Sequence, residues 1–287
     1  MKRLELVNPF GAPVYHEETV ACTMDVSRVL ADNGAPHGTV ITADFQEEGR
    51  GRVRGRLWEM ERGGNLAFTI LLRYPRIEDI PPALTLRVGL ALSLAIEDFA
   101  PVLIGSLMIK WPNDVMLCGV GKARAAKAQA AGKAQAAKAQ AAGKAAGILT
   151  EAEGGNVFIG IGVNVTQKRF PVHLREKATS LCLAVNNATG GGIFGGDKFA
   201  LLEKILARLY DEAGTVNGAF PRVDWKSRVE ARLYKKGEQV CFAEGAADSG
   251  KIVTGILAGL GPSGELLITP NGETETRSFT TGELVRS

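Results

Sequence analysis

Two stretches of this 287-residue chain repeat apolar residues at the spacing of an amphipathic helix. Thr23 can cap the first helix, and Asn33-Gly34 provides its stop. Asp197 can cap the second helix. The apolar positions that define the two predicted faces are Val26, Val29 and Leu30 in the first helix, and Phe199, Leu202, Ile205, Leu206 and Leu209 in the second.

The most apolar segment covers residues 83–99 and follows Pro81-Pro82. Proline is favoured in the first turn of a helix, so this pair predicts a helix start. Arg87 and Glu97 interrupt the segment, which is also too short to span a bilayer comfortably. We therefore expect a buried helix and no membrane partner.

Short β-like runs fill much of the remaining chain, and their spacing changes after Lys236-Gly237. Before that point strands and helices are mixed, which predicts an α+β domain over residues 1–236. After it, regular glycine turns predict a small all-β, barrel-like domain over residues 237–287. The predicted strands are residues 38–44, 66–73, 107–111, 114–118, 147–151 and 157–165 in the first domain, and 239–242, 252–257, 265–269 and 274–279 in the second.

Residues 121–142 contain two near-copies of an 11-residue unit rich in alanine, lysine and glutamine. A third copy begins at Gly143-Lys144, but the similarity ends within a few residues. We therefore infer an insertion in a hairpin loop. A glycine every eleven residues weakens any helix there. We expect a solvated, flexible loop, and the alternative is a basic arm for nucleic acid or acidic partners.

Composition and charge narrow the class of protein. Hydrophobic residues make up 45% of the chain, and the net charge of +3 is too small to indicate nucleic acid. The four cysteines and three histidines are scattered, so the sequence does not support a zinc site. Reduced thiols and the lack of an apolar leader predict a cytoplasmic protein.

Residues 49–58 alternate glycine with Arg50, Arg52, Arg54 and Arg56, and end at Trp58. Glycine lets the backbone turn tightly, while guanidinium groups suit carboxylate and phosphate oxygens. The indole offers a flat face for a ring. The segment therefore predicts a loop that closes over a small anionic ligand with an aromatic group, such as a nucleotide.

Three further motifs follow this loop in order. They are K-W-P-N-D at residues 110–114, K-A-A-G-I-L-T-E at residues 144–151 and G-I-G-V-N at residues 160–164. With the arginine loop and Cys22-Thr23-Met24, the chain resembles the catalytic domain of biotin protein ligases over roughly residues 15–287. The resemblance implies a mixed sheet flanked by helices, of the class II aminoacyl-tRNA synthetase and biotin ligase type, plus a small SH3-like barrel. It also implies the short form of the family, without an N-terminal domain that binds operator DNA.

In that family, ATP converts biotin to biotinyl-5′-AMP, and a lysine of a biotin carboxyl carrier domain then takes the biotinyl group. The resemblance implies ATP and Mg²⁺ as cofactors and the carrier domain as partner. Two anions must approach each other, so fixed cations are needed, and we assign Arg52 and Lys144 to this role. Asp114 is the third catalytic candidate, through magnesium or by orienting the reacting groups.

The remaining candidates are assigned by their motifs. The predicted biotin-binding residues are Cys22, Thr23, Met24, Gln46, Gly49, Arg50, Arg52, Lys144 and Gly147. The predicted nucleotide-binding residues are Arg52, Arg56, Trp58, Lys110, Asn113 and Asn164, with Trp58 stacking on adenine.

Plainer roles stay open for several of these. Trp58 could be a core residue and Gln46 a polar strand end, while Thr23 could serve only as a helix cap. Asp114 could build the turn, and Lys144 could be a solvated lysine of the repeat.

The chain departs from the family pattern in three places. The arginine loop is one residue longer, so the register at Val53-Arg54 is open. Cys22-Thr23-Met24 stands where the family has Ser-Thr-Asn, which removes two polar groups from the biotin pocket. The repeated segment lies directly beside Lys144.

Other functions remain in competition. A lipoate or octanoate protein ligase shares the fold and the adenylate chemistry, but the arginine loop and the C-terminal module favour biotin. An RNA-binding module could use the arginine loop and the basic insertion, although the insertion has no aromatic residues for stacking on bases. The acceptor protein stays unidentified, and the oligomeric state is open between monomer and homodimer.

Overall fold

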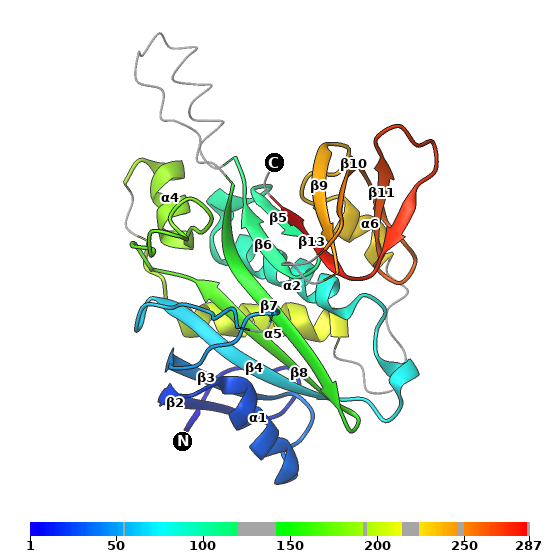
Figure 1. The fold of residues 1–287 in the computed structure, drawn as a ribbon. Coiled ribbons are helices and arrows are strands. Elements are labelled where there is room, and N and C mark those ends of the chain that lie inside the picture. Colours follow the sequence, from blue (N-terminus) through cyan, green and yellow to red (C-terminus); the bar gives the residue numbers. More distant parts are fainter. Residues whose placement is uncertain (54, 120–141, 192–193, 214–223, 246–249, 286–287) are drawn as a thin grey trace.

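The computed structural model describes residues 1–287 except 54, 120–141, 192–193, 214–223, 246–249 and 286–287. The expected flexible insertion and Arg54 of the arginine loop therefore lie outside the described residues, apart from Ala142. Figure 1 shows a large sheet with helices on both sides and a smaller sheet formed by the C-terminal part of the chain.

The large sheet has eight strands in the order β1-β2-β3-β4-β8-β7-β6-β5. Only the β2–β3 pair is parallel among these described strands. The α+β class with a mixed sheet is thus confirmed. The strands are β1 (Lys2–Leu4), β2 (Val14–Val20), β3 (Thr39–Gln46), β4 (Asn65–Arg73), β5 (Leu107–Lys110), β6 (Asp114–Leu117), β7 (Gly143–Glu153) and β8 (Asn156–Asn164).

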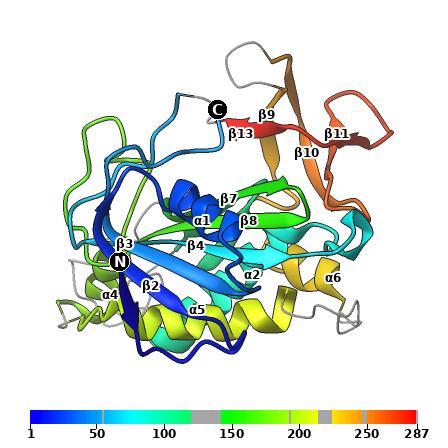
Figure 2. The same cartoon turned by 90° about the horizontal axis from the view of Figure 1, so that it is seen from below.

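Helices cover both faces of this sheet, as Figure 2 shows. On one face α1 (Thr23–Asp32) contacts β3, β4 and β8. On the other face α2 (Leu84–Phe99) contacts β5, β6 and β7 and also packs along α5 (Lys198–Ala213). The remaining helices are α4 (Leu181–Thr189), α6 (Trp225–Glu230) and the 3-10 turns η1 (Ile77–Asp79) and η2 (Pro101–Leu103).

The predicted burial of the most apolar helix is confirmed. In the described chain, Ile77–Phe99 is long and apolar enough to cross a membrane by composition, yet 67% of its most apolar window is buried inside the protein. Both charged residues that interrupt it are buried in ion pairs. Arg87 Nε lies 3.5 Å from Glu212 Oε2 of α5, and Glu97 Oε1 lies 2.8 Å from a guanidinium nitrogen of Arg232.

The predicted stop of α1 and the predicted start of α5 are confirmed. Asn33 is the C-cap of α1, and Gly34 follows it with φ +79°. Asp197 caps α5, because its Oδ1 accepts from the backbone nitrogens of Phe199 at 2.9 Å and Ala200 at 3.2 Å. The predicted apolar face of α5 is also buried, apart from the half-buried Phe199.

The predictions for the start and the face of α1 are wrong. Cys22 is the N-cap and makes no side-chain capping bond, while the hydroxyl of Thr23 turns toward β3 instead. Val29 is 59% exposed, and the buried positions of the helix are Thr23, Met24, Ser27 and Ala31. Three of these four buried side chains are small, so the stripe of large apolar residues that would mark the buried face is missing.

The C-terminal module is a five-stranded antiparallel sheet in the order β12-β11-β10-β9-β13. Its apolar side shares one cluster of buried residues with Leu86 and Leu90 of α2 and with Trp111. The Trp111 indole nitrogen donates to Gly264 O at 3.0 Å, which ties the module to the larger part. The strands are β9 (Gln239–Glu244), β10 (Ile252–Leu260), β11 (Leu266–Pro270), β12 (Arg277–Phe279) and β13 (Gly282–Val285).

Each predicted strand exists, with ends that coincide or are shifted by at most four residues. The sequence analysis missed β1, β2, β13, α4 and α6. These elements are short or lie at or next to a sheet edge, so their patterns of buried and exposed residues are weak. In β2, for example, only Val14 is fully buried.

Candidate active site

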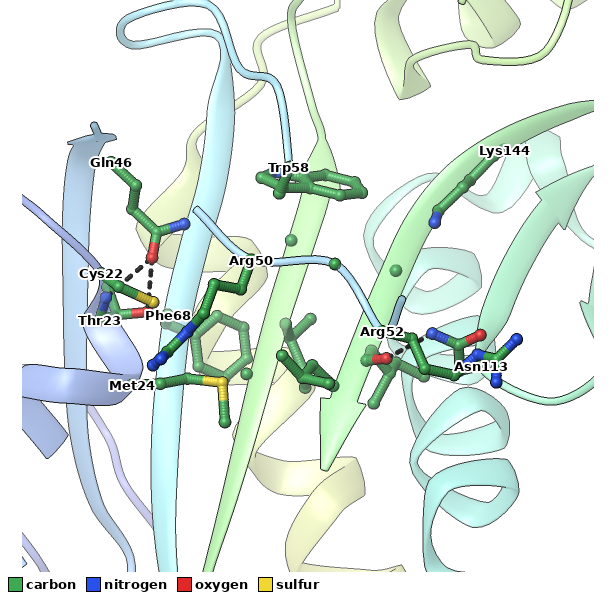
Figure 3. A pocket seen from close by; sticks show the side chains of 17 residues that line it. Cys22, Thr23, Met24, Gln46, Arg50, Arg52, Trp58, Phe68, Asn113 and Lys144 are labelled. Atoms are coloured by element: carbon green, nitrogen blue, oxygen red, sulfur yellow. Dashed lines mark hydrogen bonds between the residues drawn. The ribbon is translucent and has the colours of Figure 1, made fainter. Parts of the chain in front are cut away.

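A cavity opens on the α1 side of the large sheet, next to the first turn of that helix (Figure 3). The strands β7 and β8 form its floor, because Gly147, Ile148, Gly160 and Gly162 line it. The arginine loop and the end of β3 supply its rim. The complete lining consists of Cys22, Thr23, Met24, Gln46, Arg50, Gly51, Arg52, Trp58, Phe68, Asn113, Lys144, Gly147, Ile148, Leu149, Gly160, Ile161 and Gly162.

This cavity gathers most of the side chains that the motifs singled out, from five separate stretches of chain. The predicted residues that line it are Cys22, Thr23, Met24, Gln46, Arg50, Arg52, Trp58, Asn113, Lys144 and Gly147. The predicted residues that lie outside the lining are Gly49, Arg56, Lys110, Asp114 and Asn164.

One end of the cavity carries a chain of hydrogen bonds between buried polar groups. Thr69 Oγ1 donates to Thr23 Oγ1 at 2.9 Å, and Thr23 Oγ1 donates to Gln46 Oε1 at 2.9 Å. The backbone nitrogen of Thr23 donates to the same Gln46 oxygen at 2.8 Å. The Gln46 amide is thereby fixed with its nitrogen toward the cavity, as Figure 3 shows, where it can donate to a ligand carbonyl.

The lining next to this polar end is apolar. Met24 is 2% exposed, and its sulfur lies 3.0 Å from the place where a Cβ on Gly160 would stand. Phe68, Ile148 and Ile161 continue the surface. An apolar pocket with one oriented polar group suits a small, largely apolar ring that carries a carbonyl.

At the opposite side, a β-bulge brings a cation and a carboxylate together. The register between β6 and β7 shifts between Val115 and Met116. Across that bulge, Lys144 Nζ lies 2.7 Å from Asp114 Oδ1. The backbone of Lys144 is bound on its other edge, because its nitrogen donates to Lys177 O at 2.8 Å and its carbonyl accepts from Thr179 N at 3.0 Å.

Asn164 lies behind this pair and is only 3% exposed. Its amide nitrogen donates to Thr179 O at 2.9 Å and to Lys144 O at 3.3 Å. Its oxygen accepts from Asn65 Nδ2 at 2.8 Å. In the structure, Asn164 therefore supports the backbone that carries Lys144, and it does not line the cavity.

Trp58 covers the centre of the cavity. A Cβ on Gly162 would lie 2.3 Å from Cε2 of the indole, and a Cβ on Gly147 would lie 3.0 Å from its Cζ3. The Lys144 ammonium lies 5.4 Å from the indole centroid. The missing side chains of these two glycines therefore make room for the indole of Trp58.

Residues 49–53 and 55–58 form the two sides of a short hairpin, which we call the arginine hairpin. Gly51 N donates to Arg56 O, and Trp58 N donates to Gly49 O, each at 2.8 Å. Arg50 pairs with Asp25 of α1 at 2.5 Å. Arg52 lines the cavity, but its guanidinium also donates to Gly282 O of β13 at 2.9 Å.

The other predicted residues lie at the rim. Arg56 forms two hydrogen bonds with the carboxylate of Glu283, and Lys110 lies close enough to help lower the pKa of that carboxyl. The hydrogen bonds from Arg56 are the main reason why the pKa of Glu283 lies below its ordinary value. Gly49 is tight against the backbone, because a Cβ there would lie 3.0 Å from Trp58 O.

Sequence reasoning missed several residues that support the site. Thr69, Phe68 and Asn65 come from the central strand β4, where polar residues in an apolar run could have served as a signal. Asp25 and Glu283 carry no motif, and only the fold brings them to the hairpin. In the described residues, no three His, Cys, Asp or Glu side chains gather in a way that could hold a metal ion.

Residues 22–171, which include most of this site, match the model of the Biotin/lipoate A/B protein ligase family. The chain belongs to this family. It is 32% identical over 236 residues to the biotin–[acetyl-CoA-carboxylase] ligase of Paracoccus denitrificans, covering 79% of this chain and 82% of that protein. The resemblance that the motifs indicated is therefore confirmed.

The chain is also similar to a second curated protein and to a solved structure. The bifunctional ligase/repressor BirA of Bacillus spizizenii is 33% identical over 207 residues, which is 68% of this chain. The chain spans about half the length of the Bacillus relatives, 52% and 46%. The biotin protein ligase from Aquifex aeolicus, solved with biotin and ATP, is 25% identical with a TM-score of 0.69, covering 95% of this chain and 97% of that one.

Proposed function

We propose that this chain joins biotin to a lysine of a biotin carboxyl carrier domain, with ATP as the energy source and biotinyl-5′-AMP as the intermediate. The observation that carries the proposal is the convergence of Arg52, Lys144 and the oriented Gln46 amide on one cavity. The family and the named activities of its relatives narrow the chemistry to acyl adenylation.

In the first step, a carboxylate oxygen of biotin bonds to the α-phosphorus of ATP, and the bond to pyrophosphate breaks. Both reactants are anionic, so positive groups at the point of contact lower the barrier. Lys144 is held in place by Asp114, and Arg52 reaches the same cavity from the hairpin. Each charge-assisted hydrogen bond contributes about 1.5–3 kcal/mol.

In the second step, the amine nitrogen of the acceptor lysine bonds to the acyl carbon of the mixed anhydride and loses a proton, and AMP leaves. The anhydride must be kept from water until the acceptor arrives. The arginine hairpin and Trp58 lie over the cavity and are suited to that shielding. Trp58 can offer adenine a flat face once ligand binds.

Magnesium fits this site only when it binds together with the phosphates of ATP. Asp114 is the one acidic side chain that we assign to it, and its Oδ1 is already paired with Lys144. Mg²⁺ commonly binds through one or two carboxylates together with substrate phosphates. We propose that Asp114 meets the metal through its second oxygen, or through water, when the nucleotide brings the ion.

Biotin is favoured over lipoate or octanoate for two reasons. The relatives with long coverage are named biotin ligases, and the cavity places one fixed amide donor, Gln46, in an apolar lining. A donor there matches the ureido carbonyl of biotin, while the dithiolane ring of lipoate has no group to accept it. We also place the reaction in the cytoplasm, since all four cysteines are free thiols.

The direct test is incubation of the chain with Mg²⁺-ATP, labelled biotin and a purified carrier domain. We expect the label on the carrier lysine, none without ATP, and none on a carrier whose acceptor lysine is replaced by arginine. Labelled lipoate with a lipoyl domain is the matched second arm. Transfer of lipoate but not biotin, or no transfer of either with a folded protein, would overturn the assignment.

An RNA-binding role is tested in the same preparation by thermal unfolding. Biotin with ATP should raise the melting temperature, whereas a short RNA should leave it unchanged. Arg50 and Arg56, which an RNA site would use, are already paired with Asp25 and Glu283.

A further inference from the structure

The arginine hairpin is held by a residue from the other end of the chain. Both guanidinium nitrogens of Arg56 donate to the carboxylate of Glu283, at 2.8 and 2.9 Å. Arg52 lies 3.8 Å from the same carboxylate and donates to the neighbouring Gly282 O at 2.9 Å. One short segment of β13 therefore binds two arginines of the hairpin that covers the cavity.

The strand that carries Glu283 is itself fixed. Glu283 pairs with Ala243 of β9, and the next residue, Leu284, is only 5% exposed. Gly282 is packed so closely that a Cβ there would lie 2.3 Å from the ring of Phe242. The carboxylate thus projects from a rigid support, and its side chain is only 21% exposed.

Apart from these contacts, the described part of the hairpin is held by its own backbone hydrogen bonds, by Trp58 and by Arg50. It is rich in glycine, which raises the entropy cost of ordering it. Leu57 is 63% exposed, so Trp58 is the large apolar side chain of the hairpin that packs inward. Arg50 and its partner Asp25 anchor the opposite side through exposed groups. The order of the hairpin therefore depends on its ionic contacts.

We propose that Glu283 is a positioning residue of the ligase site: it latches the arginine hairpin over the cavity. The C-terminal module thereby preorganises Arg52 and Trp58. The role in catalysis rests on the proposed function, whereas the latch itself does not.

Trypsin offers a test that is independent of activity, because the hairpin carries cleavage sites after Arg50 and Arg52. In the ligand-free protein, Glu283→Gln should raise the rate of cleavage at these two sites roughly 2- to 5-fold, the range expected for losing a partly exposed ion pair. Fragments ending at residues 50 and 52 are counted by mass spectrometry. Glu273→Gln is the matched control, since Glu273 pairs with Arg277 inside the same module.

Charge exchange separates a latch from general damage to the fold. Arg56→Glu alone should be cleaved faster, and the double variant Arg56→Glu with Glu283→Arg should recover the slow rate. Cleavage of Glu283→Gln at the rate of the wild type and of Glu273→Gln would overturn the proposal. So would an equally fast rate in the exchanged double variant.

A second measurement links the latch to the reaction. In Glu283→Gln, release of biotinyl-AMP into solution should rise by a similar factor, while its rate of formation at saturating substrates falls less. If the wild type forms no biotinyl-AMP, the proposed function fails while the trypsin result still decides the latch. If the wild type forms it and Glu283→Gln changes neither cleavage nor release, the latch fails alone.

Discussion

Lys144 Nζ lies 2.7 Å from Asp114 Oδ1 across the bulge between β6 and β7. The carboxylate fixes the direction of a long, flexible side chain, and the ammonium lies beside the indole of Trp58 and next to the cavity. A lysine held in this way can meet a negative charge without first being ordered.

Replacing Lys144 with glutamine removes this charge and leaves a polar side chain that is one atom shorter. We expect biotin-dependent exchange between pyrophosphate and ATP to fall by about 10²–10³-fold, as for other lost electrostatic contacts to a transition state. Lys168→Gln, at an exposed lysine outside the cavity, serves as the control and should retain full exchange. Equal loss in both variants would remove Lys144 from the mechanism.

Thr23→Val breaks the hydrogen-bond chain at the polar end of the cavity. Gln46 Oε1 keeps only the bond from the backbone of Thr23, and the hydroxyl of Thr69 loses its acceptor. We expect the affinity for biotin, measured by calorimetry, to fall by about tenfold, which corresponds to about 1.4 kcal/mol.

Thr42→Val is the matched control for that variant, since Thr42 is a buried β3 residue whose hydroxyl donates to Ala67 O away from the cavity. It should lose stability but bind biotin normally. The idea fails if the two variants bind biotin alike.

Gly162→Ala places a methyl group where the indole of Trp58 lies. The indole must move out, so the tryptophan emission should shift relative to the wild type, and that shift should be absent when Trp58 is phenylalanine in both proteins. We expect adenylate formation to fall together with about 1–3 kcal/mol of stability. Gly195→Ala, where an added Cβ meets nothing within 4 Å, should change neither.

The latch should also depend on pH. The folded-state pKa of Glu283 is lowered by the hydrogen bonds from Arg56 and by the charges of Arg56, Arg52 and Lys110. A lowered pKa means that the ionised form is stabilised on folding, so this contribution is fully present above the ordinary value of 4.5 and is lost as pH falls through the lowered one.

The measurement is the difference in unfolding free energy between the wild type and Glu283→Gln, followed from pH 7 downward. It should be constant near neutrality and should disappear in the acid range below the ordinary pKa of Glu283. Other carboxyls with lowered pKa values, such as Asp44 and Glu230, occur in both proteins and cancel in the difference. A difference that persists unchanged in acid would contradict the assignment.

The repeated segment should be dispensable. Leu117 of β6 and Gly143 of β7 face each other as register partners, so the two strands need only a short connection. Deleting residues 121–142 leaves Cys118, Gly119 and Val120 between them, a length that hairpins commonly use. Biotinylation should stay within about twofold of the full chain, measured by label transfer under identical conditions. Loss of transfer in a folded deletion variant would give the segment a role.

Much of the central sheet could be predicted from the sequence, for a physical reason. Strands such as β4 and β8 are covered on both faces, so they consist of nearly continuous apolar runs that can be recognised in the sequence. Strand β2 (VYHEETV), which lies between β1 and β3, is largely half-exposed, and its sequence carries no such run. Pairing with neighbours far along the chain, rather than local preference, places it in the sheet.

The residues of the site also differ in whether local sequence could identify them. Motifs located Lys144 and Trp58, since those residues stand in short, distinctive patterns. The partners that orient them are distant: Thr69 lies 46 residues from Thr23, and Glu283 lies 227 residues from Arg56. Local sequence cannot show which distant hydroxyl or carboxylate will contact a given residue in the folded protein. It also suggested a capping role for Thr23, but the Thr23 side chain does not cap the helix.

Trp111 has a consequence for how this protein can be divided. Its indole is 4% exposed, joins Phe242 at a centroid distance of 5.8 Å and donates to Gly264 O. It stands between Lys110 and Asp114, so one pentapeptide both carries the carboxylate that pairs with Lys144 and fills the seam between the two sheets. A truncated protein ending near residue 236 would expose this apolar seam to solvent. Such a fragment should aggregate rather than behave as a minimal enzyme.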